Sequence, residues 1–181
     1  MVLLLIPYKK FCLIVPLKFQ SPQCRQGYQY FQKWNSCYKF GSPPLNYNAA
    51  EQNCMTEGGY LASIHSLEEE EFIDDLVHRT AQGLYYVIWI GFNNSGNKIL
   101  SFIQSSLDVN DVNVDHWQWT DGTEITYNNW YPSEPTTIFN CANMITTGNP
   151  YINRSYWANC CQNCSSAQYY VCKQNPICVS N

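Results

Sequence analysis

The pattern of apolar and polar positions predicts a short helix early in the chain. Ala50 and Cys54 are apolar and fall four residues apart, which places both on one side of a helix. Asn46 or Asn48 can serve as the N-cap, and the pair Gly58-Gly59 marks the end. We therefore expect one short helix in this part of the chain.

A second, longer helix follows. Ser66 and Glu69 have the spacing of a capping box, and the helical pattern continues to about Gly83. The positions that recur on one face are Phe72, Ile73, Leu76, Val77 and Thr80. The acidic run 68–71 falls in the first turn, where the helix dipole favours negative charge, and we expect it to be solvated.

Strand patterns take over after residue 83. The candidate strands are residues 84–91, 117–120, 142–146 and 169–173, and loops rich in Asn, Gly and Pro separate them. Because helices do not alternate with these strands, the sequence predicts an α+β fold. Nearer the N-terminus, Cys24 and Cys37 bracket a strand-like aromatic stretch and could staple a hairpin.

Composition narrows the class of protein. Charged residues make up only 13% of the chain, too few for the polar faces of a helical bundle. Hydrophobic residues reach 45% and aromatic residues 15%, which is enough for a packed core and argues against disorder. The formal net charge is -4 and no Lys/Arg cluster stands out, so nucleic acid is not an expected partner.

The chain has 181 residues and 10 cysteines, a number that indicates disulfides and an oxidising, extracellular compartment. No apolar run reaches the ~20 residues that a bilayer span needs. Residues 1–23 are either a poor signal peptide or a wrongly assigned start, because they lack the usual small-residue cleavage site. We therefore expect a secreted protein without a membrane span.

A long polar segment, residues 93–116, separates two of the expected strands. Its acidic part invites a calcium interpretation. As an EF-hand loop that starts at Asp111, however, it has His116 where Gly is needed and Gly122 where Glu is needed. We expect a solvated loop, with residues 97–115 as an insertion that protrudes from the domain.

Several short motifs follow one another between residues 24 and 173. They are Cys24-x-x-Gly27-Tyr28, Cys37-Tyr38, Tyr47-x-x-Ala50-x-x-x-Cys54, Gly59-Tyr60-Leu61-Ala62-Ser63-Ile64, Trp89-Ile90-Gly91, Trp117-Gln118-Trp119-Thr120-Asp121-Gly122, Asn129-Trp130, Glu134-Pro135, Cys141 and Cys164-x7-Cys172. Together they resemble the C-type lectin-like domain in its long form, which has an extra N-terminal hairpin. The domain would cover residues 24–173, followed by a C-terminal tail at 174–181.

That resemblance implies two helices flanking antiparallel sheets, with a long loop region that holds the ligand site. It also implies three disulfides, namely Cys24–Cys37, Cys54–Cys172 and Cys141–Cys164. The cluster at Cys160 and Cys161 departs from the family pattern. We expect a further disulfide of one of these two with Cys178, in preference to a redox or zinc motif.

In sugar-binding members of that family, calcium is held by a Glu-Pro-Asn triplet, a carboxylate before the third main cysteine and an Asn-Asp pair after a tryptophan. Here the corresponding residues are Glu134-Pro135-Thr136, Phe139-Asn140 before Cys141, and Ala158-Asn159 after Trp157. Only Glu134 and Asn159 remain as ligands, whereas calcium takes about 6–8 oxygens. We therefore expect no metal cofactor and a degenerate ligand site formed by Glu134, Pro135, Thr136, Trp157 and Asn159.

Other side chains add less. Aromatic residues that could stack on a sugar, anchor a protein or lie in the core are Trp130, Tyr131, Phe139, Tyr151, Tyr156 and Trp157. Asn93 and Asn153 begin glycosylation sequons, whereas we expect a disulfide to block the sequon Asn163-Cys164-Ser165. The histidines His65, His78 and His116 lie in no catalytic motif.

The sequence thus predicts a secreted binding module and not an enzyme. Its partner would be a glycan or an extracellular protein. Carbohydrate binding through the long loop region is the function that the resemblance implies. A calcium-independent protein-binding or structural extracellular module is the alternative.

Overall fold

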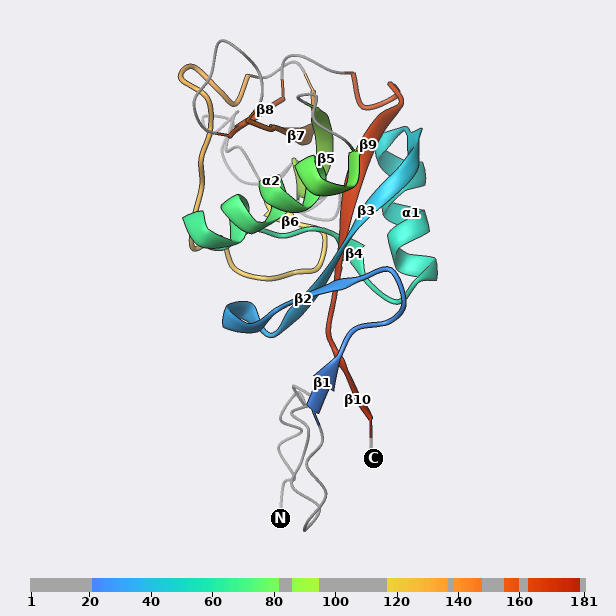
Figure 1. Cartoon of the computed structure of the whole chain (residues 1–181). Helices are drawn as coiled ribbons and strands as arrows, with labels where there is room; N and C mark the ends of the chain where they lie inside the picture. The colour runs from blue at the N-terminus through green and yellow to red at the C-terminus, as the bar shows by residue number, and fades with distance from the viewer. Residues whose placement is uncertain are drawn as a thin grey trace, which may run out of the picture.

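The computed structural model describes residues 21–81, 86–94, 117–136, 139–147, 155–159 and 163–179. These residues form the predicted α+β fold, with two α-helices, an eight-stranded sheet and a two-stranded ribbon (Figure 1). The helices are α1 (Tyr47–Thr56), α2 (Leu67–Ala81) and a short 3-10 helix, η1 (Gln32–Trp34). The strands are β1 (Ser21–Gln23), β2 (Gln29–Phe31), β3 (Ser36–Leu45), β4 (Tyr60–Leu61), β5 (Val87–Asn93), β6 (Gln118–Trp119), β7 (Cys141–Ile145), β8 (Tyr156–Ala158), β9 (Gln168–Gln174) and β10 (Ile177–Val179).

Local signals set both ends of α1 and the start of α2 as predicted. Of the two candidate caps of α1, Asn46 is the one used, and its Oδ1 accepts from the Ala49 N–H at 2.9 Å. After α1, Gly58 has a φ of +87°, a left-handed conformation that favours glycine. At α2, the Ser66 hydroxyl accepts from the Glu69 N–H at 3.2 Å.

The main sheet has the strand order β2-β3-β9-β5-β7-β8, with β4 pairing to β9 and β6 to β5. One pair departs from the predicted antiparallel arrangement, because β5 and β9 run parallel, with Ile88 opposite Tyr169. A parallel pair needs a long connection between its strands, and residues 94–167 supply one. The sheet is therefore mixed.

Alternate residues of the central strands face the two helices. Ile88 and Val171 belong to the core cluster that includes the apolar face of α2. Their neighbours Trp89 and Cys172 point the other way and pack with α1. The period of two in the strands thus gives the sheet two buried faces, each covered by one helix (Figure 1).

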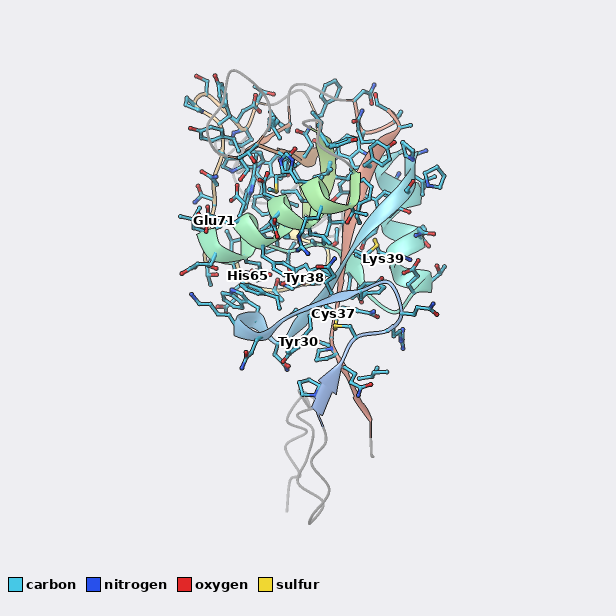
Figure 2. The ribbon with its side chains drawn as sticks, viewed as in Figure 1. Tyr30, Cys37, Tyr38, Lys39, His65 and Glu71 are labelled. Atoms are coloured by element: carbon cyan, nitrogen blue, oxygen red, sulfur yellow. A yellow bond between two sulfur atoms is a disulfide. The ribbon has the colours of Figure 1, made fainter. Side chains whose placement is uncertain are left out.

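The acidic start of α2 is not the solvated surface that the sequence predicts. Glu69 and Glu70 are both 0% exposed. Glu69 lies 2.6 Å from the Lys173 ammonium group, and it also accepts from the Tyr38 hydroxyl and from the His65 N–H. Figure 2 labels Tyr38 and His65 in this region of the molecule. The carboxylates are buried because distant residues supply a cation and hydrogen-bond donors.

Three disulfides have the predicted pairing. Their Cα–Cα distances are 5.6 Å for Cys24–Cys37, 5.3 Å for Cys54–Cys172 and 5.8 Å for Cys141–Cys164. The first links the strands of the N-terminal hairpin, where Tyr30 is opposite Cys37. The Cys54–Cys172 disulfide joins α1 to β9 and closes the longest loop of these three disulfides, with a sequence separation of 118.

Two segments that we expected to flank the domain pair with each other. Residues 21–23 and 177–179 form the antiparallel ribbon β1–β10, at the end of the molecule away from β7 and β8 (Figure 1). Within the described residues, no helix has the length and apolar character of a membrane span.

Other sequence predictions lie outside the described residues. These are the structure of residues 1–20, the insertion at 97–115, the calcium-like segment at 111–116, the pairing of Cys160 and Cys161 with Cys178, and the placement of Tyr151 and Asn153.

Candidate functional site

The candidate site lies where the loop 129–136 meets β8, at the edge of the main sheet. The Trp157 N–H donates to the Asn129 carbonyl at 2.8 Å, and the Tyr131 N–H donates to the Trp157 carbonyl at 2.8 Å. These bonds attach the loop to β8 in a parallel bridge between Trp130 and Trp157. The structure thus brings together two segments that the sequence analysis assigned to one site.

Asn159 joins these segments through every polar atom of its side chain. It is 0% exposed. Its Nδ2 donates to the Thr136 carbonyl at 2.7 Å and to the Phe139 carbonyl at 2.6 Å. Its Oδ1 accepts from the Thr136 N–H at 2.7 Å and from the Thr136 hydroxyl at 3.1 Å. The uncharged amide of Asn159 therefore supplies hydrogen-bond partners to backbone groups of the loop and links the loop to the end of β8.

Glu134 is also engaged within the protein. Its Oε2 accepts from the main-chain N–H of Asn159 at 3.0 Å and from that of Thr136 at 3.3 Å. The Glu134–Pro135 peptide bond is cis, and Ser133 before it has a positive φ of 75°. The carboxylate thus holds the loop to the end of β8.

These residues do not fit a calcium ion. Calcium needs about 6–8 inward-facing oxygens with several carboxylates among them. Here the amide donor of Asn159 lies between two carbonyl oxygens, and Glu134 already accepts from two N–H groups. In the described part of the chain, no three His, Cys, Asp or Glu side chains gather as a metal site.

Glu70 of α2 holds the N-terminal end of the loop 129–136 by hydrogen bonds. Its carboxylate accepts from the Tyr127 hydroxyl at 2.9 Å, the Asn129 amide at 2.8 Å and the Ser155 hydroxyl at 2.7 Å. Burial raises the pKa of Glu70 above its usual range, although these three donors lower it in part. One buried side chain of α2 thus fixes both the loop and the start of β8.

Two aromatic residues lie at the surface of this site. Tyr131 is 46% exposed, and its ring stands perpendicular to that of Tyr156, with the ring centroids 5.4 Å apart. Trp157, in contrast, is 0% exposed and packs against Trp119, Tyr127 and Trp130. The sequence analysis placed Trp157 and Asn159 among the ligand contacts, but both are buried and support the site from within.

Sequence reasoning missed the role of Glu70, because an acidic residue in a first helical turn is usually exposed. Its three partners lie between 57 and 85 positions further along the chain, so no local pattern could identify them. It also did not separate Tyr131 and Tyr156 from the buried aromatic residues. A Tyr beside Pro132-Ser133, at a turn, was the available signal for exposure.

Ser63, His65 and Asp121 lie together but do not form a catalytic set. The Ser63 hydroxyl donates directly to Asp121 at 2.5 Å, lies 3.2 Å from His65 Nε2 and is 0% exposed. Lys173 donates to the same hydroxyl at 3.1 Å. A nucleophile needs an accessible oxygen with a base as its hydrogen-bond acceptor, so this cluster is structural.

Comparison with known proteins agrees with the geometry. The profile of the lectin C-type domain matches residues 43–174. The type-2 ice-structuring protein of Brachyopsis segaliensis is 33% identical over 111 residues, which are 61% of this chain and 52% of that protein. This chain therefore spans about half of the ice-structuring protein's length.

A second relative is matched over most of its length. The C-type lectin lectoxin-Lio1 of Erythrolamprus poecilogyrus is 30% identical over 166 residues, which are 86% of this chain and 83% of the lectin. The solved structure of a calcium-independent type II antifreeze protein has the same fold, with a TM-score of 0.64 at 24% identity over 88% of this chain and 100% of that one. This chain therefore belongs to the C-type lectin family, whose domains are non-enzymatic binding modules.

Proposed function

We propose that this domain binds carbohydrate without calcium, at the face formed by the loop 129–136 and β8. The observation that carries the proposal is the Asn159 network. A buried amide, not a cation, lies among the oxygens of the site. Sugar hydroxyls could not complete the coordination of a metal there, so a sugar would have to contact protein atoms directly.

The exposed Tyr131 and the half-buried Tyr156 supply a surface of the right chemistry for such a contact. Tyr131 is half exposed beside Tyr156, and its backbone is held on both sides by hydrogen bonds to Trp157 and Glu134. An aromatic ring stacks on the apolar face of a sugar, while its hydroxyl can bond to the sugar's hydroxyls. A fixed backbone lowers the entropy that binding would cost.

A glycan array tests the proposal directly. The purified protein is applied once with calcium and once with a chelator, and we expect binding that is equal in the two. Binding that disappears in chelator would contradict the calcium-independent mode. Absence of binding to any glycan would instead favour the alternative, a protein-binding or structural module.

A matched pair of variants then locates the site. Tyr131→Ala should weaken binding at least tenfold, which corresponds to about 1.4 kcal/mol. Tyr60→Ala removes a tyrosine of similar exposure, 40%, from β4, which pairs with β9 and not with β8, and should leave binding unchanged. Equal effects of the two substitutions would argue against a site at Tyr131.

Ice is a second candidate ligand. The similarity to an ice-structuring protein, together with a site that does not fit calcium, favours it. Ice binding predicts a gap between the freezing and melting temperatures of a protein solution. If this thermal hysteresis is absent at millimolar protein concentration, the candidate is removed, and the glycan experiment stands by itself.

The three disulfides fit an oxidising, extracellular compartment. Secretion is part of the proposal, because a module that recognises extracellular glycans or proteins has to reach the extracellular space. A fractionation of producing cells into medium and cell extract would test it.

A further inference from the structure

We propose that Asn163 carries an N-linked glycan. The sequence Asn163-Cys164-Ser165 is a sequon, which the sequence analysis expected to be blocked by the disulfide of Cys164. In the structure, the side chain of Asn163 is exposed, whereas that of Cys164 is half-buried. This inference concerns a covalent modification and does not depend on the proposed ligand.

The acceptor amide is accessible. Asn163 is exposed and begins a turn in which the Ser166 N–H donates to its carbonyl at 2.7 Å. Its side-chain Oδ1 accepts from the Ser165 N–H at 3.0 Å. The oxygen of the amide is thus held against the turn, while the side chain as a whole is exposed, as attachment of a glycan to its nitrogen requires.

The disulfide occupies the inner side of the same turn. Cys164 is bonded to Cys141 and packs against the core cluster that covers α1. The carbonyl of Cys164 accepts from the Tyr47 N–H at the start of α1, at 3.0 Å. Asn163 is thus exposed while the neighbouring Cys164 is half-buried against the core, so a glycan on Asn163 would not have to displace the disulfide. The turn leads into β9 at the end of the domain away from the β1–β10 ribbon (Figure 1).

The sequon at Asn93 has the opposite character. Asn93 is the last residue of β5, is half-buried and stands in register with both Gln118 and Cys141. A glycan there would have to replace contacts within the sheet. We therefore expect Asn163 to be modified in preference to Asn93.

The reaction needs a co-substrate of one class, a lipid-pyrophosphate oligosaccharide in the secretory compartment. A bond forms between Asn163 Nδ2 and the anomeric carbon of the first sugar, and the bond from that carbon to the pyrophosphate oxygen breaks. The lipid pyrophosphate leaves with the electron pair, and the amide nitrogen loses one proton. The hydroxyl of Ser165 is the part of the sequon that the transferase requires.

Peptide mass spectrometry tests the proposal. The full chain is produced in eukaryotic cells, recovered from medium and microsomes, and treated with an amidase that removes N-glycans in heavy-oxygen water. An occupied site is converted to a heavy-oxygen-labelled Asp. We expect the label at Asn163, and we expect the glycosylated chain to migrate more slowly on a gel than the unglycosylated chain.

Three variants distinguish the glycan from other causes. Asn163→Gln and Ser165→Ala should each remove the label and its mobility shift, while Ser165→Thr should retain both. Ser165→Ala changes only an exposed hydroxyl and leaves Asn163 and the disulfide in place, so it remains informative if Asn163→Gln fails to fold. Recovery of the Asn163 peptide only in unlabelled form, from protein of either fraction, would overturn the proposal.

Discussion

At the scale of single residues, the side chains of Asn159 and Glu134 hold the loop together by hydrogen bonds within the protein. Asn159 holds two carbonyls with its amide hydrogens, and Glu134 holds two N–H groups with its carboxylate. Donors and acceptors are therefore balanced without a ligand. The loop is thus fixed by its own hydrogen bonds, and a fixed loop lowers the entropy that binding of a ligand would cost.

Calcium should accordingly change the melting temperature little. A ligand that binds only the folded state stabilises it by RT ln(1 + [L]/Kd), about 2.7 kcal/mol at one hundred times Kd. With the amide of Asn159 in place, we expect the dissociation constant for calcium to lie far above ~1 mM. The melting temperature measured by differential scanning calorimetry should therefore not differ between ~1 mM calcium and chelator. A rise of many degrees would show that the network opens to receive a cation.

Asn159→Asp tests the network itself. The carboxylate cannot donate to the carbonyls of Thr136 and Phe139, so we expect a loss of about 1–3 kcal/mol in the free energy of unfolding, measured in chelator. Asn128→Asp adds the same charge at an exposed position directly before the loop 129–136 and should have little effect. Equal stability of the two variants would mean that the bonds of Asn159 contribute nothing.

Glu70 makes stability depend on pH in a definite direction. Burial raises its pKa in the folded state above the ordinary value of 4.5, so in the window between the two values the folded protein binds more protons than the unfolded chain. The contribution of Glu70 to stability is then fully present below pH 4.5 and falls as the pH rises through the folded-state pKa.

Glu70→Gln removes this titration. Compared with this variant, the wild-type protein should lose free energy of unfolding as the pH rises through that window, in urea titrations at several pH values. Glu71→Gln removes one negative charge from the same turn at an exposed position and serves as the control. A constant difference between wild type and Glu70→Gln would contradict the assignment.

At the scale of elements, caps and strand alternation determine where helices and strands lie. The N-cap bond of Asn46 stabilises the first turn of α1. Asn46→Ala should therefore cost about 1 kcal/mol in chemical denaturation. Asn48→Ala, inside the first turn and exposed, should be neutral or slightly stabilising, because Ala has the higher helix propensity. The reverse order would mean that the cap lies at Asn48.

Elements were predictable to the extent that their signals are local. The ends of α1 and α2 and the places of β5, β7 and β9 follow from caps, glycines and apolar runs. The parallel pairing of β5 with β9 and the burial of Glu69 do not, because each depends on contacts more than 70 positions away. The sequence predicted which segments form the candidate loop site. It did not predict which side chains donate and which accept the hydrogen bonds within that site.

At the scale of the whole molecule, the Cys54–Cys172 disulfide closes the longest loop of the three disulfides among the residues that the structure describes. Its 118-residue separation limits the unfolded chain enough to contribute roughly 4–5 kcal/mol. That is a large part of a usual net stability of about 5–15 kcal/mol. Replacing both cysteines with serine should lower the thermal midpoint strongly.

The hairpin disulfide provides the comparison. Cys24 and Cys37 are separated by 13 residues, and their replacement should cost roughly 3 kcal/mol, with a smaller fall in the midpoint. The two double variants are compared by calorimetry under oxidising conditions. If removal of the 118-residue tie left the midpoint unchanged, α1 and β9 would not depend on it for their packing.

The β1–β10 ribbon also affects how the molecule responds to a mechanical force applied at its two strands. Ser21 is opposite Val179 and Gln23 is opposite Ile177, so a force that pulls the two strands apart at Ser21 and Val179 meets one backbone pair at a time. In a Cys178→Ser chain, where no disulfide can tether β10, the ribbon should unzip at low force. Because Cys24–Cys37 and Cys54–Cys172 lie directly behind it, the extension should then stop at a rigid, crosslinked body. A surface that holds the domain by this end could be strained without deforming the loop at the opposite end.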